Sequence, residues 1–169
     1  MRRLILFRHG KAEAGSAGGG DVNRPLARRG REDAAIMGRL LAGQGLAPDL
    51  GLVSSALRAR QTWDCARAAF PHARVQVVPG LYEASAEAVM AQVEAADGSA
   101  ATIMVVGHNP GLQELAVSLV VEAGGAASDI ARVAGKFPTA SMVIFAADAA
   151  GRLVFDELLL ARDHGGEGG

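Results

Sequence analysis

Four short apolar runs in this chain alternate with segments whose apolar residues recur at helical spacing. The runs are RLILF at 3–7, LGLVSS at 50–55, RVQVV at 74–78 and TIMVV at 102–106. Each run has the length of a strand, and the continuous apolar run at 3–7 is typical of a strand that is covered on both faces. Strands that alternate with helices predict a layered α/β fold with a mostly parallel central sheet.

The segments between and after these runs complete the predicted architecture. Helical spacing occurs at 36–41, 56–70, 86–93 and 112–119, whereas 122–140 has no clear period and is interpreted as irregular. Two more strands are expected at 141–146 and 152–160, and the short ADAAG segment between them indicates a hairpin. We therefore expect a three-layer α/β/α sandwich whose mostly parallel sheet is mixed.

Length and composition narrow the class of protein. The chain has 169 residues, is 50% hydrophobic and carries a formal net charge of −1. These values exclude a disordered tail protein and provide no overall attraction to nucleic acid or to an anionic membrane. The apolar run near the N-terminus is too short for a secretory signal, so a cytoplasmic location is expected. We expect one domain over 1–162 and a flexible, glycine-rich tail over 163–169.

Polar clusters follow each of the first four predicted strands. They are RHGK at 8–11, SSALRARQT at 54–62, LYEAS at 81–85 and GHNPG at 107–111. In open α/β sheets, ligands bind in the crevice outside the carboxyl ends of the strands. The clusters are therefore expected to meet in one site.

The residues in these clusters favour a phosphate ligand. Arg8, His9, Arg58 and His108 together supply two fixed cations and two imidazoles, and the arginine fork matches the oxygens of a doubly charged oxyanion. Ser54 stands before a predicted helix, where free backbone amides and the helix dipole also favour an anion.

His9 is the candidate nucleophile. Nearby arginines disfavour a second positive charge, so its imidazole should stay neutral near pH 7 with a lone pair free to attack phosphorus. Gly10 beside it permits a close approach of the backbone. The chain has no Walker motif, no GxSxG elbow and no cysteine or histidine spacing suited to zinc. We therefore expect no metal and no other cofactor.

The segment HNPG also has a structural interpretation. Asn109 suits the N-cap of the following helix, and Pro110 suits its first position. This interpretation does not account for His108.

The motifs FRHGKA, SSALRARQT and GHNPG resemble those of the histidine phosphatase superfamily, which includes the cofactor-independent phosphoglycerate mutases. NRPLARRG and KFPTAS are similar to the small phosphohistidine phosphatases of the SixA type. The resemblance runs through nearly the whole chain. It implies a phosphoglycerate mutase-like fold and catalysis without a metal.

The resemblance also implies roles for individual residues. His9 would be phosphorylated transiently, while Arg8, Arg58 and His108 would hold the phosphoryl oxygens. Arg24 matches a further arginine near the phosphate, and Glu83 matches the general acid of the mutases and broader phosphatases. The SixA-type branch does not always keep that acid. Asn109 stands where the acid phosphatases have an aspartate, which argues against a proton donor there.

Three functions remain open from the sequence. The first is a phosphatase that acts on phosphohistidine in proteins, and the second is a small-molecule phosphatase or mutase. The third is a module that binds phosphate without turnover. A phosphorylated protein or a small phosphorylated substrate is the expected partner, and the sequence leaves the oligomeric state open.

Overall fold

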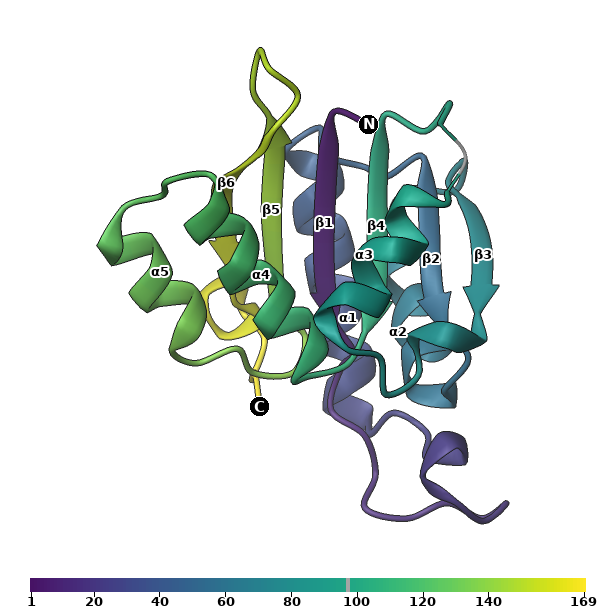
Figure 1. Ribbon diagram of the computed structural model, residues 1–169. Coiled ribbons are helices and arrows are strands. Elements are labelled where there is room, and N and C mark those ends of the chain that lie inside the picture. Colours follow the sequence, from purple (N-terminus) through teal and green to yellow (C-terminus); the bar gives the residue numbers. More distant parts are fainter. Residues whose placement is uncertain (97) are drawn as a thin grey trace.

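A six-stranded mixed sheet forms the centre of the molecule (Figure 1). The computed structural model describes residues 1–96 and 98–169. The strands, in the sheet order β3-β2-β4-β1-β5-β6, are β3 (Arg74–Val78), β2 (Leu50–Ser54), β4 (Thr102–Gly107), β1 (Arg3–Arg8), β5 (Met142–Ala147) and β6 (Leu153–Leu159). The pairs among β1 to β4 are parallel, while β5 is antiparallel to β1 and β6 is antiparallel to β5. The predicted mixed sheet with a terminal hairpin is confirmed.

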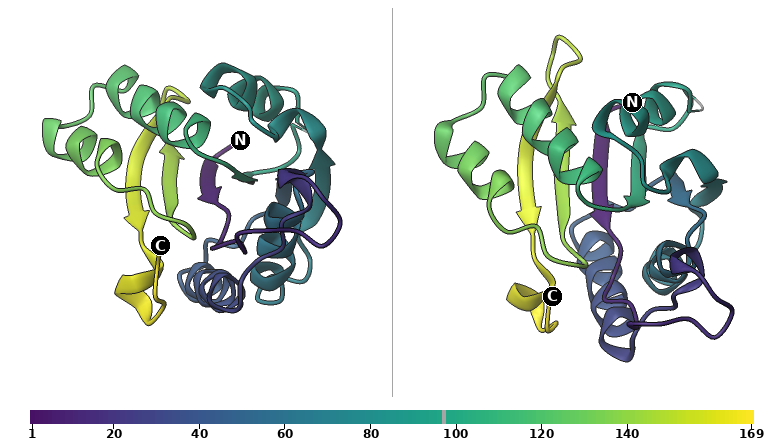
Figure 2. Two further views of the ribbon diagram at one scale, coloured as in Figure 1. Left: turned by 90° about the horizontal axis from the view of Figure 1, so that it is seen from below. Right: turned by 60° about the horizontal axis from the view of Figure 1, so that its bottom comes forward.

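Helices cover both faces of this sheet. One face carries α1 (Arg28–Gly43) and α2 (Leu57–Arg67), and the other carries α3 (Ala86–Glu94), α4 (Gly111–Glu122) and α5 (Ala127–Ala134), as the view from below shows (Figure 2). Short 3₁₀ helices are η1 (Asp21–Asn23), η2 (Pro79–Leu81) and η3 (Ala161–His164). The arrangement confirms the predicted three-layer sandwich. None of the helices in the described residues is long and apolar enough to cross a membrane.

The unbroken apolar run of β1 serves both cores. Leu4 and Leu6 pack with the core beneath α3 and α4, while Ile5 and Phe7 pack with the core beneath α1 and α2. All four side chains are fully buried. Successive side chains of a strand point to opposite faces, so a central strand between two helical layers must be apolar at every position.

Two local expectations were wrong. The segment at 122–140 contains α5, an eight-residue helix with one buried side chain, Val133. Helix α4 begins at Gly111 after Pro110, and the side chain of Asn109 does not cap it. Instead, the amide of Asn109 donates to Gln113 Oε1 over 3.1 Å.

The C-terminal residues contact α1 in this structure. The carboxylate of the buried Asp33 accepts hydrogen bonds from the backbone N–H groups of Glu167, over 2.9 Å, and Gly168, over 3.1 Å. The single domain over 1–162 and the mobility of the tail over 163–169 stay predictions.

Two glycines of α1 provide a test of how closely the helices pack. A Cβ at Gly38 would clash with the Ala66 carbonyl oxygen of α2, whereas a Cβ at the exposed Gly43 would meet nothing within 4 Å. We expect Gly38→Ala to lower the free energy of unfolding by about 1–3 kcal/mol through overpacking. Gly43→Ala should instead raise it by up to about 1 kcal/mol, because alanine favours helix. Urea unfolding measures both, and equal stabilities would contradict the close contact.

Candidate active site

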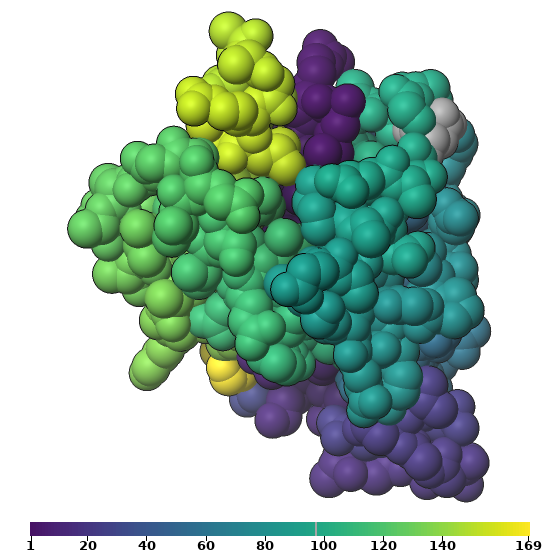
Figure 3. Space-filling model, in the orientation of Figure 1, coloured from purple at the N-terminus to yellow at the C-terminus, as the bar shows by residue number. Residues whose placement is uncertain are grey.

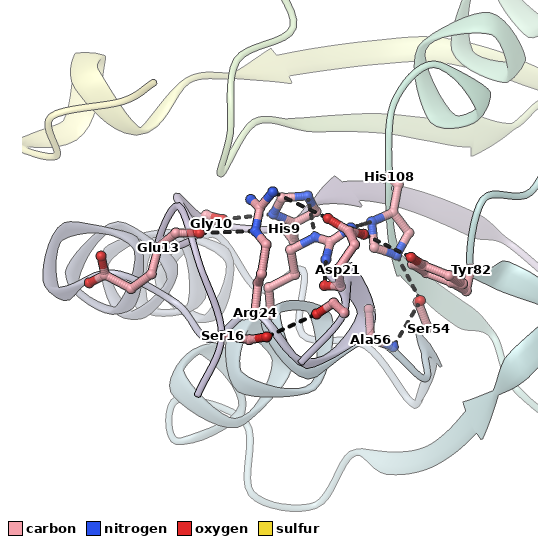
Figure 4. Close-up of polar contacts among 12 residues, drawn as sticks. His9, Gly10, Glu13, Ser16, Asp21, Arg24, Ser54, Ala56, Tyr82 and His108 are labelled. Carbon is pink, nitrogen blue, oxygen red and sulfur yellow. Dashed lines mark hydrogen bonds and ion pairs between the residues drawn. The ribbon is translucent and has the colours of Figure 1, made fainter. Parts of the chain in front are cut away.

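Three strand ends bring the predicted residues together at one edge of the sheet. His9 follows β1, His108 follows β4, and Arg58 lies in the first turn of α2, which follows β2. Arg58 Nε donates to His9 Nε2 over 3.2 Å, and Arg58 Nη2 lies 3.4 Å from His108 Nδ1. The centroids of the two imidazole rings are 5.1 Å apart (Figure 4). The fold thus gathers two histidines around one guanidinium.

The hydrogen bonds of His9 define its tautomer. Its Nδ1–H donates to the Gly10 carbonyl oxygen over 2.7 Å, so Nε2 carries the lone pair that accepts from Arg58. Burial, followed by the charges of His108, Arg58 and Arg8, lowers the pKa of this side chain to about 3, against the raising effect of the Gly10 carbonyl. The imidazole is therefore neutral at pH 7, with burial a larger cause than the arginines on which the sequence argument relied.

His108 takes the opposite tautomer. An arginine can only donate, so His108 Nδ1 accepts from Arg58 and its Nε2–H donates to the Ser54 hydroxyl over 2.7 Å. Burial, followed by the charge of Arg58, lowers the pKa of His108 to about 4. The fully buried Ser54 also accepts from the backbone N–H of Ala56 at the start of α2, over 3.3 Å. Ser54, at the end of β2, thus fixes the His108 ring, which follows β4.

Arg8 carries an unused donor at the same edge. Its Nη1 donates to the Phe137 carbonyl oxygen over 2.7 Å, and burial lowers its pKa. Among the described residues, its buried Nε has no hydrogen-bond partner. A free guanidinium N–H near two histidines suits an anionic ligand.

A threonine ties the loop after β1 to α2. The N–H of Gly10 donates to Thr62 Oγ1 over 2.9 Å, and the Thr62 hydroxyl donates to the Arg58 carbonyl oxygen over 2.7 Å. A Cβ at Gly10 would lie 2.5 Å from the Gly30 carbonyl oxygen of α1, which explains the glycine beside His9. Sequence reasoning quoted Thr62 within a motif but missed this link; its signal is the spacing of four residues from Arg58 on one helix.

Sequence reasoning also missed Asp21. Its Oδ2 accepts from Arg58 Nη2 over 3.0 Å and from the Tyr82 hydroxyl over 2.8 Å, and its Oδ1 accepts from Arg24 Nη1 over 3.2 Å. Its backbone oxygen accepts from Arg58 Nη1 over 2.8 Å. Asp21 follows Gly20, whose φ of 76° favours glycine. A lone acid three residues before Arg24, in a glycine-rich loop, was the available signal.

The remaining two predicted residues lie at the margin. Arg24 reaches the site through Asp21, and its Nε donates to the Glu13 carbonyl oxygen over 2.9 Å. Glu83 is exposed, follows Tyr82 and has a φ of 54°. Within the described part of the chain, its carboxylate forms no hydrogen bond or ion pair with the other residues of the site.

A metal centre was not expected from the sequence. Across residues 1–96 and 98–169, no group of three or more histidine, cysteine, aspartate or glutamate side chains is arranged to hold a metal ion. The absence of a metal requirement stays a prediction.

Comparison with known proteins decides the family. The histidine phosphatase superfamily (branch 1) matches residues 4–103, which is more than half of the chain. The chain belongs to this superfamily. The resemblance drawn from the motifs is confirmed, and family membership supports phosphatase activity.

Two further proteins are similar to this chain in sequence. An uncharacterized protein of Mycobacterium tuberculosis is 34% identical over 138 residues, which cover 82% of this chain and 85% of that protein. An uncharacterized chloroplastic protein of Arabidopsis thaliana is 34% identical over 130 residues, which cover 70% of this chain. The match spans only 59% of the plant protein.

Solved structures show the same architecture. A protein of Agrobacterium tumefaciens assigned as the phosphohistidine phosphatase SixA is 28% identical, with a TM-score of 0.81 over 94% of this chain and 97% of that chain. A SixA-assigned protein of Nakamurella multipartitia is 25% identical, with a TM-score of 0.81 over 94% and 95%. A phosphoglycerate mutase of Plasmodium falciparum is 18% identical, with a TM-score of 0.61 over 92% and 88%, and shares the fold. The expected phosphoglycerate mutase-like fold is confirmed.

The lowered pKa of His9 predicts a loss of stability in acid. Below about pH 6.5 the unfolded chain binds a proton at His9, whereas the folded state does not until about pH 3. The contribution of neutral His9 to the free energy of unfolding is therefore full above pH 6.5 and is lost as the pH falls toward 3. Between pH 7 and pH 5 we expect His9 to account for a loss of about 1–2 kcal/mol. Urea unfolding at several pH values measures this loss.

Replacement of His9 should weaken that dependence. His9→Ala should show a shallower decrease of unfolding free energy with falling pH than the wild type. His72→Ala, which removes an exposed histidine after α2, is the matched control. Identical slopes for His9→Ala and the wild type would refute the assignment.

Proposed function

We propose that this protein is a phosphatase that removes phosphoryl groups from phosphohistidine in proteins through a transient phospho-His9. The observation that carries the proposal is that the His9 imidazole is neutral inside a cationic site. Its Nε2 lies 3.2 Å from Arg58 Nε and carries a lone pair. The similarity to SixA-assigned proteins supports phosphohistidine as the substrate class.

The proposed reaction has two displacements at phosphorus. In the first, His9 Nε2 attacks, the bond from phosphorus to the leaving group breaks, and the leaving group departs with the electron pair. In the second, water attacks the phosphoryl group, and the pair of the phosphorus–nitrogen bond returns to Nε2. Arg8 and Arg58 offset the two negative charges of the phosphoryl oxygens, which is the largest electrostatic requirement of such a transfer.

Binding of the substrate requires a rearrangement of donors. In the free protein Arg58 Nε donates to His9, and both Nη atoms donate to Asp21. The phosphoryl oxygens replace these acceptors and release the lone pair of Nε2. A nearby dianion also raises the pKa of His108, so that its Nδ1 gains a proton and donates to the substrate.

The exposed position of Glu83 bears on substrate choice. An alkoxide is a poor leaving group and needs a proton in the transition state, whereas an imidazole leaves a P–N bond more readily. Glu83 forms no hydrogen bond or ion pair with the phosphate-binding residues, and Asp21, which contacts Arg58, is held ionised by its hydrogen bonds. A site without a poised proton donor therefore favours phosphohistidine. Because Glu83 lies at the rim of the site and matches the general acid of the mutases and broader phosphatases, a small-molecule phosphatase or mutase is the alternative function.

The phosphoenzyme is the first test of the proposal. Wild-type protein quenched in alkali after mixing with a ³²P-labelled phosphohistidine protein, in buffer containing EDTA, should carry an acid-labile label. His9→Ala should carry none, because the attacking nitrogen is gone, and His72→Ala should match the wild type. Undiminished labelling of His9→Ala would refute the nucleophile. Binding without turnover by the wild type would favour a phosphate-binding module.

Glu83→Gln tests the substrate class. We expect it to slow hydrolysis of an alkyl phosphate by about tenfold or more relative to phosphohistidine, since general acid assistance contributes roughly 10²- to 10⁴-fold where it operates. Steady-state kcat/KM on both substrates measures the ratio, and Glu87→Gln in α3 is the matched control. Faster wild-type cleavage of the ester, with Glu83 essential for both substrates, would support the small-molecule phosphatase instead.

A further inference from the structure

Asp21 occupies the donors that a phosphoryl group needs. Its carboxylate accepts hydrogen bonds from Arg58, Arg24 and the Tyr82 hydroxyl. The loop that carries it is part of the purple projection at the bottom of the molecule (Figure 3), and Asp21 contacts Tyr82 just after η2. The Asp21 side chain is 45% exposed, so a bound substrate can reach it.

The position of Asp21 relative to the nucleophile is defined by Arg58. The Nε of the planar guanidinium faces His9 Nε2, and its Nη2 faces Asp21 Oδ2 over 3.0 Å. The same guanidinium therefore donates to both the nucleophile and the carboxylate. In an in-line displacement the leaving group departs on the side of phosphorus opposite the nucleophile. A phosphoryl group that takes up these donors between His9 and Asp21 would direct its leaving group toward Asp21.

The carboxylate is ionised when it meets that leaving group. The hydrogen bond from the Tyr82 hydroxyl, followed by the hydrogen bond and the charge of Arg58, lowers the pKa of Asp21. An ionised carboxylate can only accept hydrogen bonds. It suits a leaving group that presents an N–H and cannot protonate an alkoxide.

We propose that Asp21 selects phosphohistidine by accepting a hydrogen bond from the second ring nitrogen of the substrate imidazole. This inference rests on the proposed function and names what recognises its leaving group. A carboxylate beside that nitrogen favours its protonated form, because the ring is then cationic.

The protonated ring leaves without any proton transfer. His9 Nε2 forms its bond to phosphorus while the bond from phosphorus to the substrate nitrogen breaks. The electron pair goes to that nitrogen, the second nitrogen keeps its proton, and the ring departs as neutral imidazole. Asp21 changes neither its protonation nor its charge.

The same carboxylate disfavours phosphate esters relative to phosphohistidine. Their leaving oxygen offers no N–H to Asp21, whereas the carboxylate competes with the phosphoryl group of either substrate for Arg58. Removal of the charge relieves this competition for both substrates but removes the hydrogen bond to the leaving group only for phosphohistidine, so the ratio of the two rates should fall.

Asp21→Asn tests the inference through a ratio. We would measure kcat/KM for free phosphohistidine and for p-nitrophenyl phosphate on the same preparation, so that the fraction of folded enzyme cancels. The ratio of phosphohistidine to ester should fall more than fivefold. Asp64→Asn, which removes an exposed acid of α2, is the matched control and should keep the wild-type ratio.

A ratio within fivefold of the wild-type ratio, or a ratio that rises, would overturn the role of Asp21. The proposed function would still hold in that case, provided that the wild type cleaves phosphohistidine. Failure of the wild type to cleave phosphohistidine would instead remove the proposed function. If Asp21→Asn does not fold, Tyr82→Phe decides the question, because it removes the hydroxyl that orients the carboxylate. A fall in the ratio of more than twofold supports the inference, and a smaller change overturns it.

Discussion

The hydrogen bond from Arg58 Nε to the buried His9 Nε2 is the contact on which the site depends. It places a permanent cation against an imidazole that burial keeps neutral. A protonated ring there would leave two positive charges in contact with little solvent to screen them. The proposed nucleophile therefore stays deprotonated without a separate base, and the cation that suppresses its protonation is also the one proposed to bind phosphate.

Several short contacts hold this pair in register. Thr62 joins the loop after β1 to the backbone of α2, so His9 and Arg58 are positioned by one connected network. Ser54 fixes His108 from the end of β2. The parallel strands bring these ends to one edge, and the apolar layers on both faces of the sheet keep that edge rigid.

In the free protein, the negative charge of Asp21 offsets part of the positive charge of the site. Asp21 takes the place of an anion on Arg58, and Tyr82 and Arg24 hold it there from the rim. A half-exposed carboxylate on a glycine-rich loop can yield these donors to a phosphoryl group and remain beside the leaving group. We therefore assign two roles to Asp21: it balances the charge of Arg58 in the free protein, and it selects the leaving group of the substrate.

The sequence by itself determined the layered fold, the edge where the site forms and the cluster of Arg8, His9, Arg58 and His108, because strand and helix periods and the motifs at strand ends are local patterns. It did not reveal α5, because this helix has only eight residues and lies between glycine-containing segments that favour an irregular interpretation. Only the tertiary structure decided the two histidine tautomers and the place of Asp21, which lies 37 residues from Arg58 and 61 from Tyr82 along the chain. Such contacts depend on the path of an aperiodic loop across the completed sheet, and no local spacing of residues encodes that path.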